Sequence, residues 1–148
     1  MISDVIEKNC QTFGLDFKLI RAIVLTESGG KSSVARYEAQ YIYTFRIPFF
    51  ATKCGISQDT ETQLQKMSWG PMQVMGGLAR QLGFDGFLPD LCKPDVGIYY
   101  GCKYLKSLKS RYSLDEDTIA AYNAGSPRRK ADGGYVNQDY VNKVKGNL

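Results

Sequence analysis

The sequence contains no histidine among its 148 residues. This absence excludes Ser-His-Asp and Cys-His catalysis, and also the zinc proteases that bind metal through an H-E-x-x-H helix. An enzyme with this sequence must use carboxylates, hydroxyls, lysines or thiols. The cysteines are few and form no C-x-x-C pair, so neither a zinc site nor a thioredoxin-like motif is indicated. Their even number permits disulfides, and half-buried reduced thiols fit the spacing equally well. We therefore expect no metal and no cofactor. The four cysteines are Cys10, Cys54, Cys92 and Cys102.

The sequence also lacks a long apolar run and a signal peptide. No stretch approaches the roughly 20 apolar residues that a membrane-spanning helix needs. The N-terminus carries Asp4 and Glu7 where a signal peptide has basic residues, and no sustained apolar segment follows. We therefore expect a chain that is made in the cytoplasm, does not insert into a membrane, and needs a separate route for any work outside the cytoplasm.

The excess of positive charge is small. A net charge of +4 suits a polyanionic partner but leaves nucleic acid, anionic lipid and bacterial cell wall open. A DNA-binding domain would need a recognition helix with clustered Arg and Lys. Lys103, Lys106 and Lys109 share a helix face, but Tyr and Leu alternate with them as core residues do. We therefore expect no nucleic-acid partner.

What the sequence does contain indicates one helical domain. A length of 148 residues fits a single domain, and 43% hydrophobic and 23% charged residues are typical of soluble globular proteins. Ser3 is the expected cap of the first helix, and Pro48 should break any regular element around it. No pair of strands is convincing, so we expect a compact all-α domain over residues 1–148 with many short helices. Hydrophobic periodicity and capping residues predict helices near residues 4–12, 17–27, 59–66, 70–82, 95–111, 115–122 and from 138 onward, with a single turn at 88–92.

Glu27 is a carboxylate on an otherwise apolar stripe. Ile20, Ile23, Val24 and Glu27 recur at helical spacing, so they share one face. Ser28 and the two glycines after it should then end the helix. Desolvation on such a face should raise the pKa of the carboxyl group, and a protonated carboxylic acid at neutral pH can act as a general acid. The alternative is an exposed glutamate in a frayed last turn.

Three short motifs follow one another along the chain, each of them weak alone but specific in this order and spacing. They are Glu27-Ser28, then Gly70-Pro71-Met72-Gln73-Val74-Met75, then Ala120-Ala121-Tyr122-Asn123-Ala124-Gly125. With these motifs the sequence resembles the lytic transglycosylases and goose-type lysozymes, and the resemblance spans about Leu15 to Val144. Within that family it looks most like single-domain phage or prophage cell-wall enzymes.

The resemblance implies a lysozyme-like fold with a glycan-binding cleft. It implies cleavage of the β-1,4 bond between N-acetylmuramic acid (MurNAc) and N-acetylglucosamine (GlcNAc) of peptidoglycan, with formation of 1,6-anhydro-MurNAc. Glu27 would be the catalytic acid and then the base, and the substrate's own N-acetyl group would assist, so no second carboxylate is required. The expected partner is the peptidoglycan glycan strand and the expected state is a monomer. The enzyme would act in the periplasm or cell wall after release from a bacterial cytoplasm, or be carried in a phage particle.

The same motifs imply residues that bind the sugar. Gln73 matches the family's sugar-binding glutamine, whose amide offers both donors and an acceptor. Met75 would line the cleft, and the hydroxyl of Tyr122 would hold the catalytic carboxyl group. Asn123 could contact substrate or merely cap a helix end. The candidate substrate-binding residues are Ser28, Gln73, Met75, Tyr122 and Asn123.

Glu38 leaves the reaction type open. If Glu38 faces the cleft it could activate water, and the enzyme would be an inverting muramidase. We expect instead a residue that orients the site through an ion pair or hydrogen bond. A non-catalytic wall-binding or virion module with the same fold is the competing class, and the presence of Glu27 argues against it.

Overall fold

A computed structural model describes all 148 residues. It contains eight α-helices, one short 3-10 helix and three short strands, so the predicted mainly α-helical class is confirmed and is consistent with a lysozyme-like fold. The helices are α1 (Ile2–Phe13), α2 (Phe17–Ser28), α3 (Ile47–Cys54), α4 (Gln58–Gln65), α5 (Gly76–Gln81), η1 (Leu88–Cys92), α6 (Pro94–Arg111), α7 (Asp115–Ala124) and α8 (Gln138–Gly146). The strands are β1 (Ala35–Tyr37), β2 (Met67–Trp69) and β3 (Val74–Met75).

The chain divides into two compact units. The first unit joins residues 1–29 to residues 102–148, and the second consists of residues 30–101. Helix α6 runs through both, since its residues up to Gly101 belong to the second unit and its residues from Cys102 onward to the first. That residues 1–148 form one domain stays a prediction.

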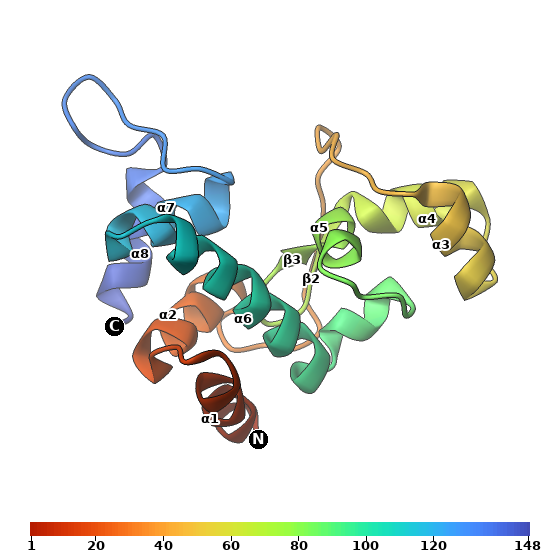
Figure 1. Cartoon of the computed structure of the whole chain (residues 1–148), viewed down its shortest axis with the longest axis horizontal. Coiled ribbons are helices and arrows are strands. Elements are labelled where there is room, and N and C mark those ends of the chain that lie inside the picture. The colour runs from red at the N-terminus through yellow and green to blue at the C-terminus, as the bar shows by residue number, and fades with distance from the viewer. The chain divides into compact units, whose positions relative to one another are not determined.

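In the first unit the core is made by the apolar faces of its helices. Helix α2 packs against α1 and α8, and α8 also packs against α7 (Figure 1). Ile20 and Ile23 of α2 are fully buried, as are Val141 and Val144 of α8. Full burial of such a side chain stabilises a fold by about 1.5–3 kcal/mol, so these helices are held mainly by their shared apolar faces.

Helix α2 begins and ends as its sequence predicts. The Asp16 carboxylate accepts a hydrogen bond of 3.0 Å from the backbone N–H of Leu19 and so caps the first turn. Gly29 ends the helix in the left-handed conformation, with φ of 63°. Glu27 therefore lies in the last turn of a helix whose two ends are both fixed.

The second unit contains a small antiparallel sheet, and the expectation that the chain has no strand pair is wrong. β1 pairs with β2 and β2 pairs with β3, so that Arg36 lies opposite Ser68 and Ser68 lies opposite Met75. Strands of two or three residues are too short to show the alternation by which a strand is recognised in sequence.

The helix predicted over residues 70–82 forms only from Gly76 onward. The preceding residues make the turn between β2 and β3, where the backbone N–H of Gln73 donates to the carbonyl of Gly70 at 3.1 Å. Gly70 has φ of 75°, and a Cβ there would lie 2.0 Å from the carbonyl oxygen of Leu91. Pro71 therefore belongs to a tight turn packed against η1 rather than to the first turn of a helix.

Two further sequence expectations about helix boundaries are wrong. Helix α1 begins at Ile2, so Ser3 lies inside it and is not its cap. Pro48 does not break the chain but lies in the first turn of α3. A proline fits there because the first N–H groups of a helix have no partner within the helix and the fixed φ of proline is already helical.

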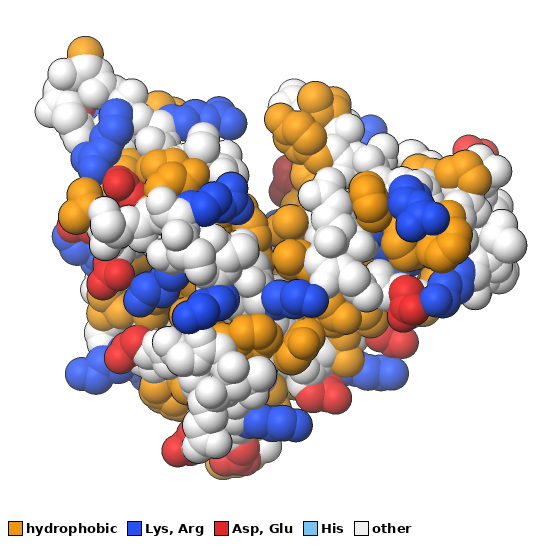
Figure 2. Space-filling view, in the orientation of Figure 1, with side chains coloured by type: hydrophobic (Ala, Val, Ile, Leu, Met, Phe, Trp, Pro, Cys, Tyr) orange, Lys and Arg blue, Asp and Glu red, His pale blue; other side chains and the backbone are white.

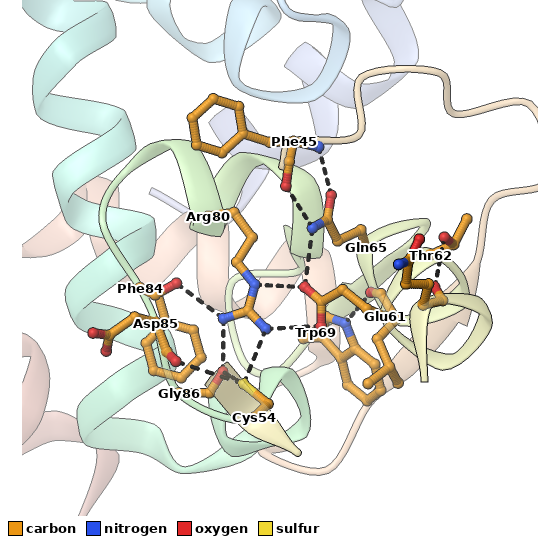
Figure 3. Close-up of polar contacts among 12 residues, drawn as sticks. Phe45, Cys54, Glu61, Thr62, Gln65, Trp69, Arg80, Phe84, Asp85 and Gly86 are labelled. Carbon is orange, nitrogen blue, oxygen red and sulfur yellow. Dashed lines mark hydrogen bonds and ion pairs between the residues drawn. The ribbon is translucent and has the colours of Figure 1, made fainter. Parts of the chain in front are cut away.

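In the second unit a buried polar network joins α4, α5 and the residues that follow α5 (Figure 3). The guanidinium of Arg80 and the carboxylate of Glu61 are both fully buried and meet through two hydrogen bonds, of 2.7 and 3.0 Å. Arg80 also donates to the carbonyls of Phe84 and Gly86 at 3.0 and 2.6 Å. The guanidinium and the carboxylate thus have hydrogen-bond partners within the protein. A buried charge is tolerated only when it is paired in this way.

The same network holds the segment between β1 and α3. The Gln65 side chain donates to Glu61 at 2.9 Å, accepts from the backbone N–H of Phe45 at 2.7 Å and donates to the Phe45 carbonyl at 2.9 Å. The middle of the segment is exposed, with Ile42 at 76% and Tyr43 at 65%. Figure 2 shows hydrophobic side chains at the tip of this segment. The aromatic residues between Tyr37 and Phe50 are therefore divided between an exposed tip and a buried anchor.

All four cysteines are free, and Cys102 is fully buried, which raises the pKa of its thiol to about 12. Such a thiol is inert at neutral pH because the thiolate is the reactive form. We expect a reductant and a metal chelator each to leave unchanged the cell-wall cleavage that the sequence resemblance implies. Turbidity loss of a bacterial wall suspension measures this, and clear inhibition by the chelator would reveal a metal requirement.

None of the helices combines the length and the apolar character that crossing a bilayer requires.

Candidate active site

The candidate acid, Glu27, is half-buried in the last turn of α2. The apolar stripe predicted for this helix is confirmed, because Ile20 and Ile23 are fully buried and Val24 is 2% exposed. The carboxyl group is thus placed at the edge of an apolar core, where it is partly removed from water.

Tyr140 of α8 contacts this carboxyl group directly. Its hydroxyl donates a hydrogen bond of 2.7 Å to Oε1 of Glu27, across 113 residues of sequence. Burial, the charge of Glu27 and this hydrogen bond raise the pKa of Tyr140 far above its ordinary value. Tyr140 is therefore a neutral donor at every pH at which the protein would work, and its hydrogen bond favours the ionised form of Glu27.

Sequence reasoning missed Tyr140. Its signal was weak: Tyr140 directly precedes Val141 and lies one helical turn from Val144, both of which are buried, so it lies at the edge of the apolar face of α8. Nothing in that pattern indicates that the opposing residue on α2 is a carboxylate.

Tyr122 of α7 is a second tyrosine on which the charge of Glu27 acts. It is buried, and burial together with the charge of Glu27 raises the pKa of its hydroxyl well above the ordinary value. Its ring packs on that of Tyr104, with centroids 5.2 Å apart. The charge of Glu27 therefore acts on the Tyr122 hydroxyl. The expected role of Tyr122 in holding that carboxyl group stays a prediction.

The charge of Glu27 contributes to the raised pKa of both Tyr122 and Tyr140. The candidate site in the first unit thus combines the carboxyl group of Glu27 with the neutral side chains of Tyr122 and Tyr140. This composition suits a single group that gives up a proton and later takes one back.

Ser28 and Asn123 are both held by hydrogen bonds within the first unit. Ser28 is buried, and its hydroxyl donates to the carbonyl of Val24 at 3.0 Å. Asn123 is exposed just before the end of α7, and its Oδ1 accepts a hydrogen bond of 3.0 Å from Nδ2 of Asn137. Their predicted contacts with substrate stay predictions.

In the second unit Gln73 is buried, and hydrogen bonds from its side chain hold it in place. Its Nε2 donates to the carbonyls of Val34 and Gly70 at 3.0 and 2.9 Å, and its Oε1 accepts from the hydroxyl of Ser68 at 2.8 Å. Its backbone is in the left-handed region, with φ of 48°, a strained conformation for a residue other than glycine. The side chain therefore stabilises the turn, and both amide hydrogens are used in doing so. Its predicted sugar contact stays a prediction and would rely on the remaining acceptor capacity of Oε1.

Met75 lies in the sheet of the second unit, and Glu38 lies just after it. Met75 is half-buried at the end of β3, just before α5. Glu38 directly follows β1 and is exposed, and its backbone N–H donates to the carbonyl of Lys66 at 2.8 Å. The expected role of Glu38 in orienting the site stays a prediction.

No group of three or more His, Cys, Asp or Glu side chains is arranged to hold a metal ion.

Comparison with known proteins identifies the class to which this site belongs. The family model for the transglycosylase SLT domain matches residues 4–143, nearly the whole chain, and contains every residue of the site described above. The protein is therefore an enzyme of the peptidoglycan lytic transglycosylase class, which acts on glycosidic bonds of the bacterial cell wall. The chain belongs to the transglycosylase SLT domain family, as the three motifs predict. No curated protein and no solved structure matches the sequence.

The hydrogen bond from Tyr140 gives the first prediction for this site. Tyr140→Phe removes a donor that favours the carboxylate form of Glu27, so the pKa of Glu27 should rise. A hydrogen bond to a charged group contributes about 1.5–3 kcal/mol, which corresponds to about one to two pH units. A general acid must be protonated to act, and Glu27 is the candidate acid. We therefore expect the alkaline limb of the pH dependence of kcat/KM to move to higher pH by about one unit.

The matched control for this experiment is Tyr112→Phe. Tyr112 is half-exposed just after α6, and the substitution makes the same chemical change away from Glu27. An alkaline limb that stays in place in a folded Tyr140→Phe protein would mean that this hydrogen bond does not tune the acid.

Proposed function

We propose that this enzyme cleaves the β-1,4 bond between MurNAc and GlcNAc in peptidoglycan and leaves a 1,6-anhydro-MurNAc end. The observation that supports this most strongly is the Glu27 carboxyl group, which is half-buried and accepts a hydrogen bond of 2.7 Å from the hydroxyl of Tyr140. One carboxyl group is enough for a reaction in which the substrate supplies its own nucleophile.

In the first half of the reaction, protonated Glu27 donates its proton to the glycosidic oxygen as the bond to the anomeric carbon breaks. GlcNAc leaves as an alcohol, and the N-acetyl oxygen of MurNAc stabilises the positive charge at the anomeric carbon. Tyr140 then donates to the carboxylate that has formed on Glu27, and so stabilises it at the stage when it carries charge.

In the second half, the Glu27 carboxylate takes the proton from the 6-hydroxyl of MurNAc. The oxygen of that hydroxyl bonds to the anomeric carbon, closes the 1,6-anhydro ring and restores protonated Glu27. No water is consumed. The same residue acts first as acid and then as base, which requires a pKa near the working pH.

Mass spectrometry of the fragments released from purified cell wall tests the proposal. We expect products lighter by one water than those of a hydrolysing enzyme, because the anhydro ring replaces addition of water. Products with a reducing end would instead make the enzyme a muramidase of the same family, and the absence of any released fragment would indicate a wall-binding module.

Glu38 distinguishes the first two outcomes. Its exposure and its position outside the Glu27–Tyr140 pair favour a role other than catalysis. We expect Glu38→Gln to lower activity by no more than about threefold, since surface substitutions usually have small effects, and to leave the product anhydro. An inverting muramidase that uses Glu38 as its base would instead lose on the order of 10²-fold or more.

We further propose that the enzyme acts in the periplasm or cell wall, as a phage-type endolysin or as a wall-degrading component of a virion. The Arg36-Tyr37-Glu38 and Tyr135-Val136-Asn137-Gln138 segments, which look like features of single-domain phage enzymes, support this. Lysis of bacteria on expression together with a membrane-permeabilising protein, and no lysis without one, would support an endolysin role.

A further inference from the structure

The carboxamide of Asn137 joins the start of α8 to the end of α7. Its Nδ2 donates one hydrogen bond of 3.0 Å to the backbone carbonyl of Ala120 and another of 3.0 Å to Oδ1 of Asn123. Both partners lie on α7, which also carries Tyr122, and Tyr140 lies three residues after Asn137. Asn137 thus lies between the helices that bring these two tyrosines to Glu27.

These two bonds determine which way the Asn123 amide faces. A backbone carbonyl can only accept, so the atom of Asn137 that faces Ala120 must be the nitrogen. That nitrogen has a second N–H, which faces Asn123, so the atom of Asn123 that faces it must be the oxygen. The Nδ2 group of Asn123 is thereby turned away from Asn137, and no hydrogen bond within the chain uses it.

Asn137 adopts this arrangement although it forgoes two other bonds. It occupies the N-cap position of α8, but its side chain makes no capping bond. Its own Oδ1 is buried without a partner. Buried polar atoms in native proteins are nearly always paired, and asparagine is among the best capping residues, so both features are unfavourable for stability. Both unfavourable features of Asn137 are accounted for if the orientation that it imposes on Asn123 is needed for binding.

The loop between α7 and α8 holds Asn137 firmly in this position. Tyr135 is buried, and its hydroxyl donates to the carboxylate of Asp117 on α7. Arg129 donates to the same carboxylate at 2.9 Å and lies over the Tyr135 ring. Asn123 itself is exposed, so its outward N–H groups are available to a ligand.

We propose that Asn137 is a positioning residue that holds the Asn123 amide with its N–H groups outward, so that Asn123 donates hydrogen bonds to an acceptor oxygen of the bound saccharide. The acceptor is the acetamide carbonyl or the lactyl carbonyl of MurNAc. The inference rests on the proposed function, since it assumes that a saccharide binds beside Glu27.

The principal test is the effect of Asn137→Asp on the kinetics of cleavage of soluble glycan strands. Aspartate caps a helix as well as asparagine, but it has no N–H, so Asn123 must turn its own N–H groups inward and its oxygen outward. We expect KM to rise about tenfold and kcat to change by less than about twofold, because a ground-state contact is lost. Asn142→Asp makes the same change at an exposed position of α8 and should leave KM unchanged.

A double-mutant cycle separates positioning from general support of the fold. Asn123→Ala should raise KM to a similar extent, and adding Asn137→Asp to it should raise KM no further, because the side chain that Asn137 orients is gone. Effects that multiply in the double variant, or a wild-type KM in Asn137→Asp, would overturn the proposal. If Asn137→Asp does not fold, Asn137→Ser, which can cap but cannot reach two partners, takes its place in the cycle.

Side-chain amide NMR gives a readout that does not depend on cleavage. The Asn123 signals are identified by their loss in Asn123→Ala, and tri-N-acetylchitotriose should shift them in the wild-type protein but not in Asn137→Asp. A shift with this sugar indicates the acetamide, and a shift only with a MurNAc-containing fragment indicates the lactyl group. No shift with either would overturn the inference, whereas a wild-type protein that binds but releases no anhydro product would overturn only the proposed function.

Discussion

Glu27→Gln should abolish cleavage of the cell wall while leaving the fold intact. Glutamine has nearly the same shape and its Oε1 can still accept the hydrogen bond that Tyr140 donates at 2.7 Å, so the packing of α2 against α8 is retained. It cannot donate a proton to the leaving oxygen or take one back. Loss of such a proton transfer typically costs on the order of 10²- to 10⁴-fold, and here one group carries both transfers.

The measurement is the rate of anhydro-muropeptide release from purified wall, with thermal unfolding as the check on folding. Glu7→Gln provides the matched control, because it makes the same change at an exposed position of α1 and should keep full activity. More than a few per cent of wild-type activity in a folded Glu27→Gln protein would assign the acid to another residue.

The largest effect on stability is expected at the buried ion pair of the second unit. Glu61→Gln leaves the Arg80 guanidinium fully buried with no carboxylate, and places an amide N–H₂ where an acceptor is needed. Breaking one side of a buried ion pair costs about 3–5 kcal/mol. Since a domain of this kind is stable by about 5–15 kcal/mol, the loss should be visible as a large drop in the urea midpoint.

Two further variants make this prediction specific. Asp59→Asn changes an exposed carboxylate in the first turn of the same helix and should cost less than about 1 kcal/mol. Glu61→Leu combined with Arg80→Leu removes both charges and should be more stable than either single change, because no buried charge is left unpaired. A double variant as unstable as the sum of the two singles would mean that volume and not charge governs this site.

The parts of the fold that the sequence predicts are those whose causes lie within a few residues. Helix α2 begins after Asp16 and ends before Gly29 because each of these residues forms a hydrogen bond with a backbone group three or four positions away. The parts that it does not predict depend on distant contacts. The turn at Gln73 exists because its side chain reaches the Val34 carbonyl, 39 residues away, and no local pattern distinguishes that turn from the start of a helix.

The candidate site shows the same division. The place of Glu27 at the edge of an apolar core could be inferred because its own helix presents it on an apolar stripe, and the order of the motifs predicted the class of enzyme. Tyr140 could not, because its importance lies in a contact across 113 residues. For Asn137 the sequence gives its position at the helix start. The hydrogen bonds that its side chain forms could not be predicted, because their partners lie on α7.

The hydrogen bonds from α8 to the end of α2 determine when, during synthesis, the enzyme can become active. Tyr140 reaches Glu27 across 113 residues, and Asn147 reaches Thr26 across 121. While the ribosome still encloses α8, the first 29 residues have emerged but lack the helix that completes their core. Such late long-range contacts make folding slow. The candidate acid Glu27 therefore gains its hydrogen-bond donor only after α8 has left the ribosome, and a product truncated before α8 would carry every motif residue and yet lack the Glu27–Tyr140 pair.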